Sequence, residues 1–188
     1  MLSEEVMKET ALRYGAKKAA GIAVADIPFR REFRRACEAN SCGKYGKCWT
    51  CPPDVGDIDE LIARAKTYQR CLLFQSVSDL EDSFDVEGML EAGRRHSEMT
   101  RRFWAEMKPQ MPAGTLMLSA GGCGACDRCA KEDGEPCRHP EDALASLEAY
   151  GIAVSEIARL GGMKYINGAD TVTYFSAMFF MEEDACGK

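Results

Sequence analysis

Histidine is scarce in this sequence, since only His96 and His139 occur among 188 residues. A histidine-based catalytic metal site or a cysteine–histidine nucleophile pair would have to use one of these two, and neither has a matching context. The chain also lacks the radical-SAM spacing Cys-x3-Cys-x2-Cys, the phosphate-binding Gly-x4-Gly-Lys-Ser/Thr loop and the dinucleotide-binding Gly-x-Gly-x-x-Gly motif. The sequence therefore gives no sign of these three enzyme classes.

Excess basic charge and long apolar runs are also missing. The net charge of -6 argues against a general nucleic-acid binder, which would carry a basic excess. No run of about 18 apolar residues is present to span a membrane. The first residues, Met1-Leu-Ser-Glu-Glu-Val-Met-Lys, lack the basic-then-apolar order of a secretory signal. We therefore expect a cytoplasmic protein without a nucleic-acid or membrane partner.

Cysteine, in contrast, is abundant, with ten residues. In a reducing compartment such clusters hold metal rather than form disulfides. Eight of the ten fall in two short segments, cysteine loop one (residues 37–53) and cysteine loop two (residues 121–140). The other two are Cys71, which is expected in the core of a strand, and Cys186, which is expected as an exposed free thiol in the polar tail.

Loop two carries the more specific pattern, with two successive two-residue spacings and a fourth cysteine after seven residues: Cys123, Cys126, Cys129 and Cys137. This run is typical of a [4Fe–4S] cluster, because each corner iron needs its own thiolate. Zinc is the alternative metal, although zinc sites more often use two separated Cys-x2-Cys pairs. His139 is expected to hydrogen-bond a sulfur or to cap a helix near Pro140 rather than to be a ligand.

Loop one supplies four further thiols: Cys37, Cys42, Cys48 and Cys51. The interleaved Gly43 and Gly46 let the backbone bend and bring amide N–H groups close to the sulfurs. We predict a second metal centre here, most simply another [4Fe–4S] cluster. Two alternatives stay open: Cys37 and Cys48 could be buried hydrophobic residues while only part of the set binds metal, or one site could draw ligands from both loops.

A local excess of basic residues, from Arg30 to Lys47, accompanies loop one in an otherwise acidic chain. These cations could offset the negative charge of a thiolate-ligated cluster or contact an acidic partner. The simpler interpretation is a solvated helix face, with Arg30, Arg31, Arg34 and Arg35 opposite Phe29, Phe33 and Cys37.

Hydrophobic patterns along the chain alternate between helices and strands. Helices are expected over residues 4–14 (capped by Ser3), 58–65 (capped by Asp57), 84–108, 141–150 and 152–160. Strands are expected over residues 21–27, 71–77, 114–120 and 171–181. These patterns predict a single domain over residues 1–188, of α/β or α+β class, with a roughly four-stranded sheet layered by helices.

Two details of this prediction concern exposure. The last strand is expected to be central and buried, and the alternative is an edge strand at the interface of a homodimer. His96, beside Arg94 and Arg95 in the long helix, is expected to be exposed.

Four motifs together resemble a family of small bacterial and archaeal proteins that is known as a predicted metal-binding family (domain of unknown function 2284). They are Cys42-x-x-Tyr45-Gly46-x4-Cys51-Pro52-Pro53, Cys123-x-x-Cys126-x-x-Cys129, Cys137-Arg138-His139-Pro140-Glu141 and Leu147-Glu148-Ala149-Tyr150-Gly151-Ile152. The resemblance covers roughly residues 20–180 and implies iron–sulfur or other metal binding, without an assigned reaction. Cys37, Cys42 and Cys51 match the family pattern, whereas Cys48 falls where other members often carry a non-ligating residue.

The sequence thus predicts an iron–sulfur protein of an anaerobe, with two [4Fe–4S] clusters that transfer electrons to a redox protein partner. A second hypothesis is an enzyme or cofactor-activating protein, in which Cys48 is not a ligand and loop one leaves an iron open to substrate. A third is a zinc-stabilised binding module whose contact surface is the basic segment from Arg30 to Lys47.

Overall fold

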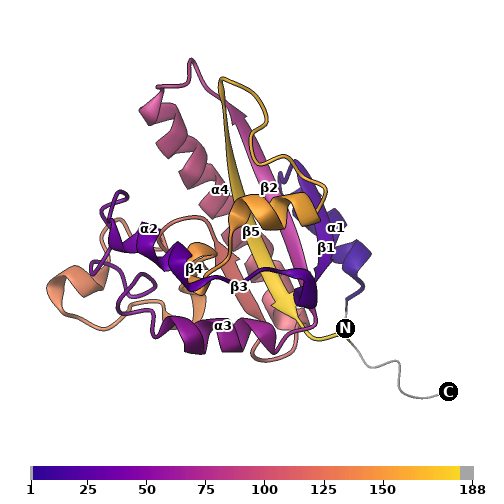
Figure 1. The fold of residues 1–188 in the computed structure, drawn as a ribbon, viewed down its shortest axis with the longest axis horizontal. Helices are drawn as coiled ribbons and strands as arrows, with labels where there is room; N and C mark the ends of the chain where they lie inside the picture. The colour runs from indigo at the N-terminus through magenta and orange to yellow at the C-terminus, as the bar shows by residue number, and fades with distance from the viewer. Residues whose placement is uncertain (1, 183–188) are drawn as a thin grey trace.

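A five-stranded mixed sheet forms the centre of the computed structural model, which describes residues 2–182 (Figure 1). Its order is β1 (Lys18–Ala23), β2 (Arg70–Asp79), β5 (Thr171–Phe180), β3 (Leu116–Ser119) and β4 (Ala145–Ser146). The first four are antiparallel neighbours, and β3 and β4 pair in parallel. The α+β alternative of the predicted class is therefore confirmed, and β5 is a central strand, as the simpler expectation held.

Helices cover both faces of this sheet. Their bounds are α1 (Glu4–Arg13), α2 (Arg34–Glu38), α3 (Ile58–Lys66), α4 (Val86–Met107) and α5 (Val154–Leu160). Short 3-10 turns connect them over Val24–Asp26, Arg31–Phe33, Lys108–Gln110, Ala130–Asp133, Pro140–Asp142 and Glu148–Tyr150. Within residues 2–182, no helix combines the length and the apolar character that crossing a membrane requires.

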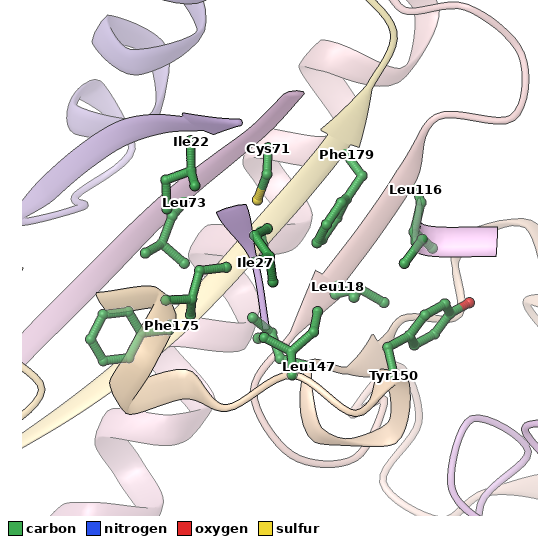
Figure 2. Packing of buried hydrophobic residues seen from close by; sticks show 14 of the residues in the cluster. Ile22, Ile27, Cys71, Leu73, Leu116, Leu118, Leu147, Tyr150, Phe175 and Phe179 are labelled. Atoms are coloured by element: carbon green, nitrogen blue, oxygen red, sulfur yellow. The ribbon is translucent and has the colours of Figure 1, made fainter. Parts of the chain in front are cut away.

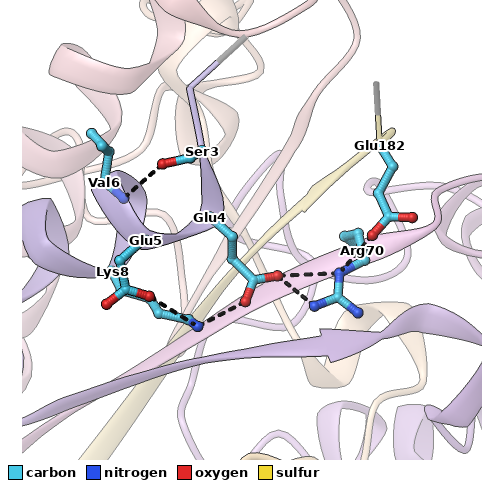
Figure 3. Close-up of polar contacts among 7 residues, drawn as sticks. All are labelled: Ser3, Glu4, Glu5, Val6, Lys8, Arg70 and Glu182. Carbon is cyan, nitrogen blue, oxygen red and sulfur yellow. Dashed lines mark hydrogen bonds and ion pairs between the residues drawn. The ribbon is translucent and has the colours of Figure 1, made fainter. Parts of the chain in front are cut away.

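Side-chain caps begin α1 and α3 where the sequence predicted them. The Ser3 hydroxyl accepts a hydrogen bond from the Val6 N–H, and the Asp57 carboxylate accepts from the N–H groups of Asp59 and Glu60. Each such cap contributes about 1 kcal/mol. Helix α1 is also tied to the sheet, because Glu4 bonds Lys8 within the helix and Arg70 on β2 (Figure 3).

The alternating side chains of the strands divide the core into two layers. One face carries Cys71, Leu73, Leu118, Phe175 and Phe179, which pack against α3, α5 and the segment around Leu147 and Tyr150 (Figure 2). The opposite face carries Leu72, Phe74, Met117 and Met178, which pack against α1 and α4. Cys71 is fully buried, as predicted, whereas Cys186 lies outside the described residues.

The predicted helix over residues 141–150 is wrong. This segment instead contains the 3-10 turn at Pro140, strand β4 and the 3-10 turn at Glu148. Leu144 packs into the α4 layer, whereas Leu147 packs into the opposite layer. The segment therefore passes around the edge of the sheet, which explains why its apolar residues do not lie on one helical face.

The predicted exposure of His96 is also wrong, because only 1% of this residue is accessible. His96 lies on the buried stripe of α4 together with Ala92, Met99 and Phe103, at helical spacing. Its ring nitrogens are within 2.7 Å of the Ser76 hydroxyl and 2.8 Å of the Ser176 hydroxyl. The adjacent Arg94 and Arg95 suggested that His96 was exposed as well. Consecutive residues of a helix lie on different faces, however, so the two arginines can be solvated while His96 is buried.

Burial lowers the pKa of His96 from 6.5 to about 4. Between these two values the unfolded chain binds a proton that the folded chain does not, so the free energy of unfolding must fall as the pH falls. From about pH 7 to about pH 5 we expect a loss of about 2 kcal/mol from this residue alone. Urea unfolding at both pH values measures it, and His96→Gln should remove this part of the slope. An unchanged slope in the variant would contradict the assignment.

Candidate metal centre

The two cysteine loops line one common cavity. Their ribbons lie beside α2 and β4, on the left of Figure 1. The cavity has a volume of about 130 Å³. Five cysteines line it, four from loop two and one from loop one: Cys123, Cys126, Cys129, Cys137 and Cys48. The structure therefore brings together all four predicted ligands of loop two.

The cavity lies in the connection between two parallel strands. Such strands need a crossover, which is commonly a helix. Here loop two forms the crossover from β3 to β4, and Gly121 and Gly124 adopt positive φ values of 65° and 63°. A side chain at Gly124 would in addition lie 3.2 Å from the Ser97 hydroxyl on α4. These two glycines let the cysteine-rich backbone turn tightly after the strand.

The thiols of loop one are also grouped. Cys51 is close enough to Cys37 and Cys42 for their charges to raise its pKa, although its hydrogen bond to Cys48 is the larger cause. Burial, followed by the charge of Glu148, raises the pKa of Cys37. The structure thus places Cys37, Cys42 and Cys51 near one another, and Cys48 between them and the cavity of loop two.

Cys48 joins the two groups of thiols. It is 5% exposed, and its sulfur lies 3.4 Å from the Thr50 hydroxyl. Hydrogen bonding from Cys51 lowers the pKa of Cys48, with smaller contributions from Thr50 and the backbone N–H of Cys123, against the opposing effect of burial. Cys48 thus belongs to loop one in the sequence and lines the cavity of loop two in the structure.

A polar and aromatic clamp holds the two loops together. The Trp49 indole N–H donates to the Glu135 carbonyl at 3.0 Å. The Lys131 ammonium lies 4.3 Å from the centre of the Trp49 ring and forms an ion pair with Asp54. Since Trp49 and Asp54 belong to or adjoin loop one and Lys131 and Glu135 belong to loop two, these contacts fix one loop against the other.

Arg101 of α4 contacts the first cysteine of loop two. Its guanidinium donates to the Cys123 carbonyl, lies 3.2 Å from the Cys123 sulfur, and donates to the Asp142 carbonyl at 2.9 Å. Its buried Nε–H has no partner among the described residues. A fixed cation beside a ligand sulfur suits a negatively charged metal–thiolate group, so the donor set and its surroundings fit such a group.

Arg34 holds the backbone that follows loop one. It is 9% exposed and donates to the carbonyls of Gly56 at 2.8 Å and Ala149 at 3.0 Å. The interpretation of the arginines as a solvated helix face is therefore wrong for Arg34. It holds for Arg30 and Arg31, which are exposed and pair with Glu156 and Asp59.

The remaining predicted features are placed as follows. His139 lines the cavity of loop two, together with Lys44 and Arg138. Its side chain makes no capping hydrogen bond to the 3-10 turn at Pro140. Among residues 2–182, no three or more Cys, His, Asp or Glu side chains already converge on the position of a single metal ion. The nine described cysteines are all free thiols.

Sequence reasoning missed Arg101, Trp49 and Lys131. Arg101 is one of several arginines on an otherwise regular amphipathic helix, and no local pattern separates it from Arg102. Trp49 lies inside loop one, where an aromatic residue among cysteines and glycines could have drawn notice. The contacts of all three depend on how distant segments meet, which the spacing of residues does not encode.

Comparison with known proteins gives one match. A family model described as a predicted metal-binding protein (DUF2284) matches residues 20–180. No curated protein and no solved structure matches the chain.

The two neighbouring arginines of α4 give a matched test of the support under loop two. Arg101→Gln removes the cation beside Cys123, whereas Arg102→Gln removes an exposed cation that stacks on Tyr14. We expect Arg101→Gln to lower metal affinity about tenfold or more, because such supporting contacts orient the ligands. Metal per chain after dialysis against a graded chelator series measures this. Equal losses in both variants would contradict the assigned role of Arg101.

Proposed function

Because the chain belongs to this predicted metal-binding family, we propose that its two cysteine loops hold two [4Fe–4S] clusters and that the protein transfers single electrons to a redox protein partner. The ligands of one cluster would be Cys123, Cys126, Cys129 and Cys137. Those of the other would be Cys37, Cys42, Cys48 and Cys51.

The observation that carries this proposal is the cavity between the loops. All four cysteines of loop two line it, together with Cys48 of loop one. A cluster suits such an arrangement, because each thiolate binds its own iron. A single zinc ion would instead need all four sulfurs at about 2.3 Å from one position.

The charges around the thiols support an anionic group. Lys44 and Arg138 line the cavity, and Arg101 lies against the Cys123 sulfur. These cations would offset the negative charge of thiolate ligands, and the hydrogen bond from Arg101 to the Cys123 sulfur would favour a more positive reduction potential. When bound, an iron–sulfur cluster supplies one-electron chemistry, and the protein fixes the ligands, the charges and the access of water.

The position of Cys48 favours transfer between the two centres. Cys48 lines the cavity of loop two, and hydrogen bonding from Cys51 and from the backbone N–H of Cys123 lowers its pKa. Two centres held by these loops would lie close together, with few intervening atoms. The free cysteines suit a reducing cytoplasm, and an anaerobe would protect such clusters from oxygen.

A second candidate rests on the same residue. Cys48 lines the cavity of loop two, which leaves Cys37, Cys42 and Cys51 as the local thiols of loop one. A cluster with three thiolates has one iron open to a substrate, and the protein would then be an enzyme or a cofactor-activating protein rather than an electron carrier.

Metal and acid-labile sulfide analysis of protein purified without oxygen tests the proposal. Two clusters give about eight irons and eight sulfides per chain. Cys126→Ser should lose about half of the iron, whereas Cys71→Ala, which removes a buried thiol outside both loops, should lose none. Zinc in place of iron, without sulfide, would refute the electron-transfer proposal and leave a zinc-stabilised binding module.

Cys48→Ser in the same analysis separates the two candidates. If Cys48 is a ligand of a closed cluster, the variant should lose up to about four irons on exposure to a mild chelator. Full retention of iron and sulfide would contradict the closed second cluster and favour the open-iron candidate.

A further inference from the structure

A second and larger cleft adjoins the cysteine cavity. Its volume is about 780 Å³, within the range of about 300–1,000 Å³ that is typical of small-molecule sites. Trp49, Thr50, Cys137 and Ala143 line both the cleft and the cysteine cavity. A molecule in the cleft would therefore contact residues that also line the cysteine cavity, including Cys137.

The walls of the cleft combine apolar and polar surface in similar amounts. The apolar part includes both tryptophans of the chain, Trp49 and Trp104, with Met111, Leu116 and Leu144. In the described structure β4 pairs only with Leu118 and Ser119 of β3, so the strand edge at Leu116 borders the cleft instead of another strand. The cleft thus offers aromatic and aliphatic side chains for an apolar body and polar groups for its charged end.

One cation of the cleft is free of ion pairs. Lys108 pairs with Asp142, and Asp54 pairs with Lys131. For Arg64, in contrast, no carboxylate lies within ion-pair distance among residues 2–182. The exposed Arg64 and the buried Tyr150 both line the cleft. Their side chains supply donors for an anionic oxygen.

Glu141 is the other charged residue of the lining. It is exposed, and its backbone carbonyl accepts a hydrogen bond from Lys108 at 2.7 Å. Its carboxylate is thus at a solvated rim, where repulsion of a bound anion is screened.

We propose that this cleft binds a small organic acid, with its carboxylate on Arg64 and Tyr150 and its apolar body between Trp49 and Trp104. That the acid lies beside a metal centre rests on the proposed function, whereas its binding does not. The bound acid would contact Cys137 of loop two, and it would act as a substrate or an effector of the metal centre that this loop is proposed to hold.

Phenylbutyrate and its neutral amide, phenylbutyramide, form a matched pair of probes. Titration calorimetry and tryptophan fluorescence of the anaerobically purified protein should give saturable binding of phenylbutyrate and a change in emission, because both tryptophans line the cleft. Arg64→Gln should weaken phenylbutyrate about tenfold and leave phenylbutyramide unchanged. Arg159→Gln, an equivalent change at an exposed arginine outside the cleft, should affect neither.

Ala113→Phe supplies an independent variant, since Ala113 is exposed at the rim and the larger ring would block the cleft without entering the core. It should abolish binding of both probes. Equal affinity for the two probes, or binding that survives Ala113→Phe, would overturn the proposal. Iron and sulfide are measured on the same samples, so loss of metal with intact binding would refute only the proposed function, and intact metal without binding only this inference.

Discussion

The contact between the two cysteine loops is the constraint on which the rest of the site depends. In the chain, loop one lies between β1 and β2, and loop two connects β3 to β4. These two pairs of strands lie at opposite edges of the sheet, so the strand order alone does not require the loops to meet. Two contacts hold them together: Trp49 of loop one donates a hydrogen bond to Glu135 of loop two, and Asp54, next to loop one, forms an ion pair with Lys131. The backbone N–H of Cys123 also contributes to lowering the pKa of Cys48. Without these contacts, eight thiols would lie on two independent loops.

The sheet and the helices serve this contact by fixing the base of each loop. Arg101 reaches from α4 to Cys123, and Arg34 reaches from α2 to the carbonyls of Gly56 and Ala149. Arg34 is buried and Arg101 is half-buried, and away from water hydrogen bonds to backbone carbonyls are stronger than on the surface. Arg101 thus fixes the start of loop two, and Arg34 fixes the backbone that follows loop one.

The local features of the fold could be predicted from the sequence, and the contacts between distant segments could not. The caps at Ser3 and Asp57 and the apolar runs of β2 and β5 determine their elements through interactions within a few residues. Residues 141–150 were misassigned, because the three-residue spacing of Leu144 and Leu147 is typical of one helical face, whereas the two side chains pack on opposite sides of the sheet.

The same limit applies to single residues. The burial of His96 depends on its serine partners in β2 and β5, and the roles of Arg34 and Arg101 depend on loops that lie far away in the chain. The spacing of the cysteines, in contrast, was sufficient to group the four cysteines of loop two around one cavity, because four thiols on one short loop cannot lie far apart. It could not place Cys48, whose position is set by the meeting of the two loops.

Electron paramagnetic resonance of the fully reduced, anaerobically purified protein tests most directly whether the loops form one site with two clusters. Adjoining clusters are expected to couple magnetically, which broadens the spectrum at full reduction. On partial reduction, when most molecules carry a single unpaired spin, the spectrum should simplify to that of an isolated cluster. Two signals that remain uncoupled at every stage of reduction, or the absence of an iron–sulfur signal, would contradict the claim.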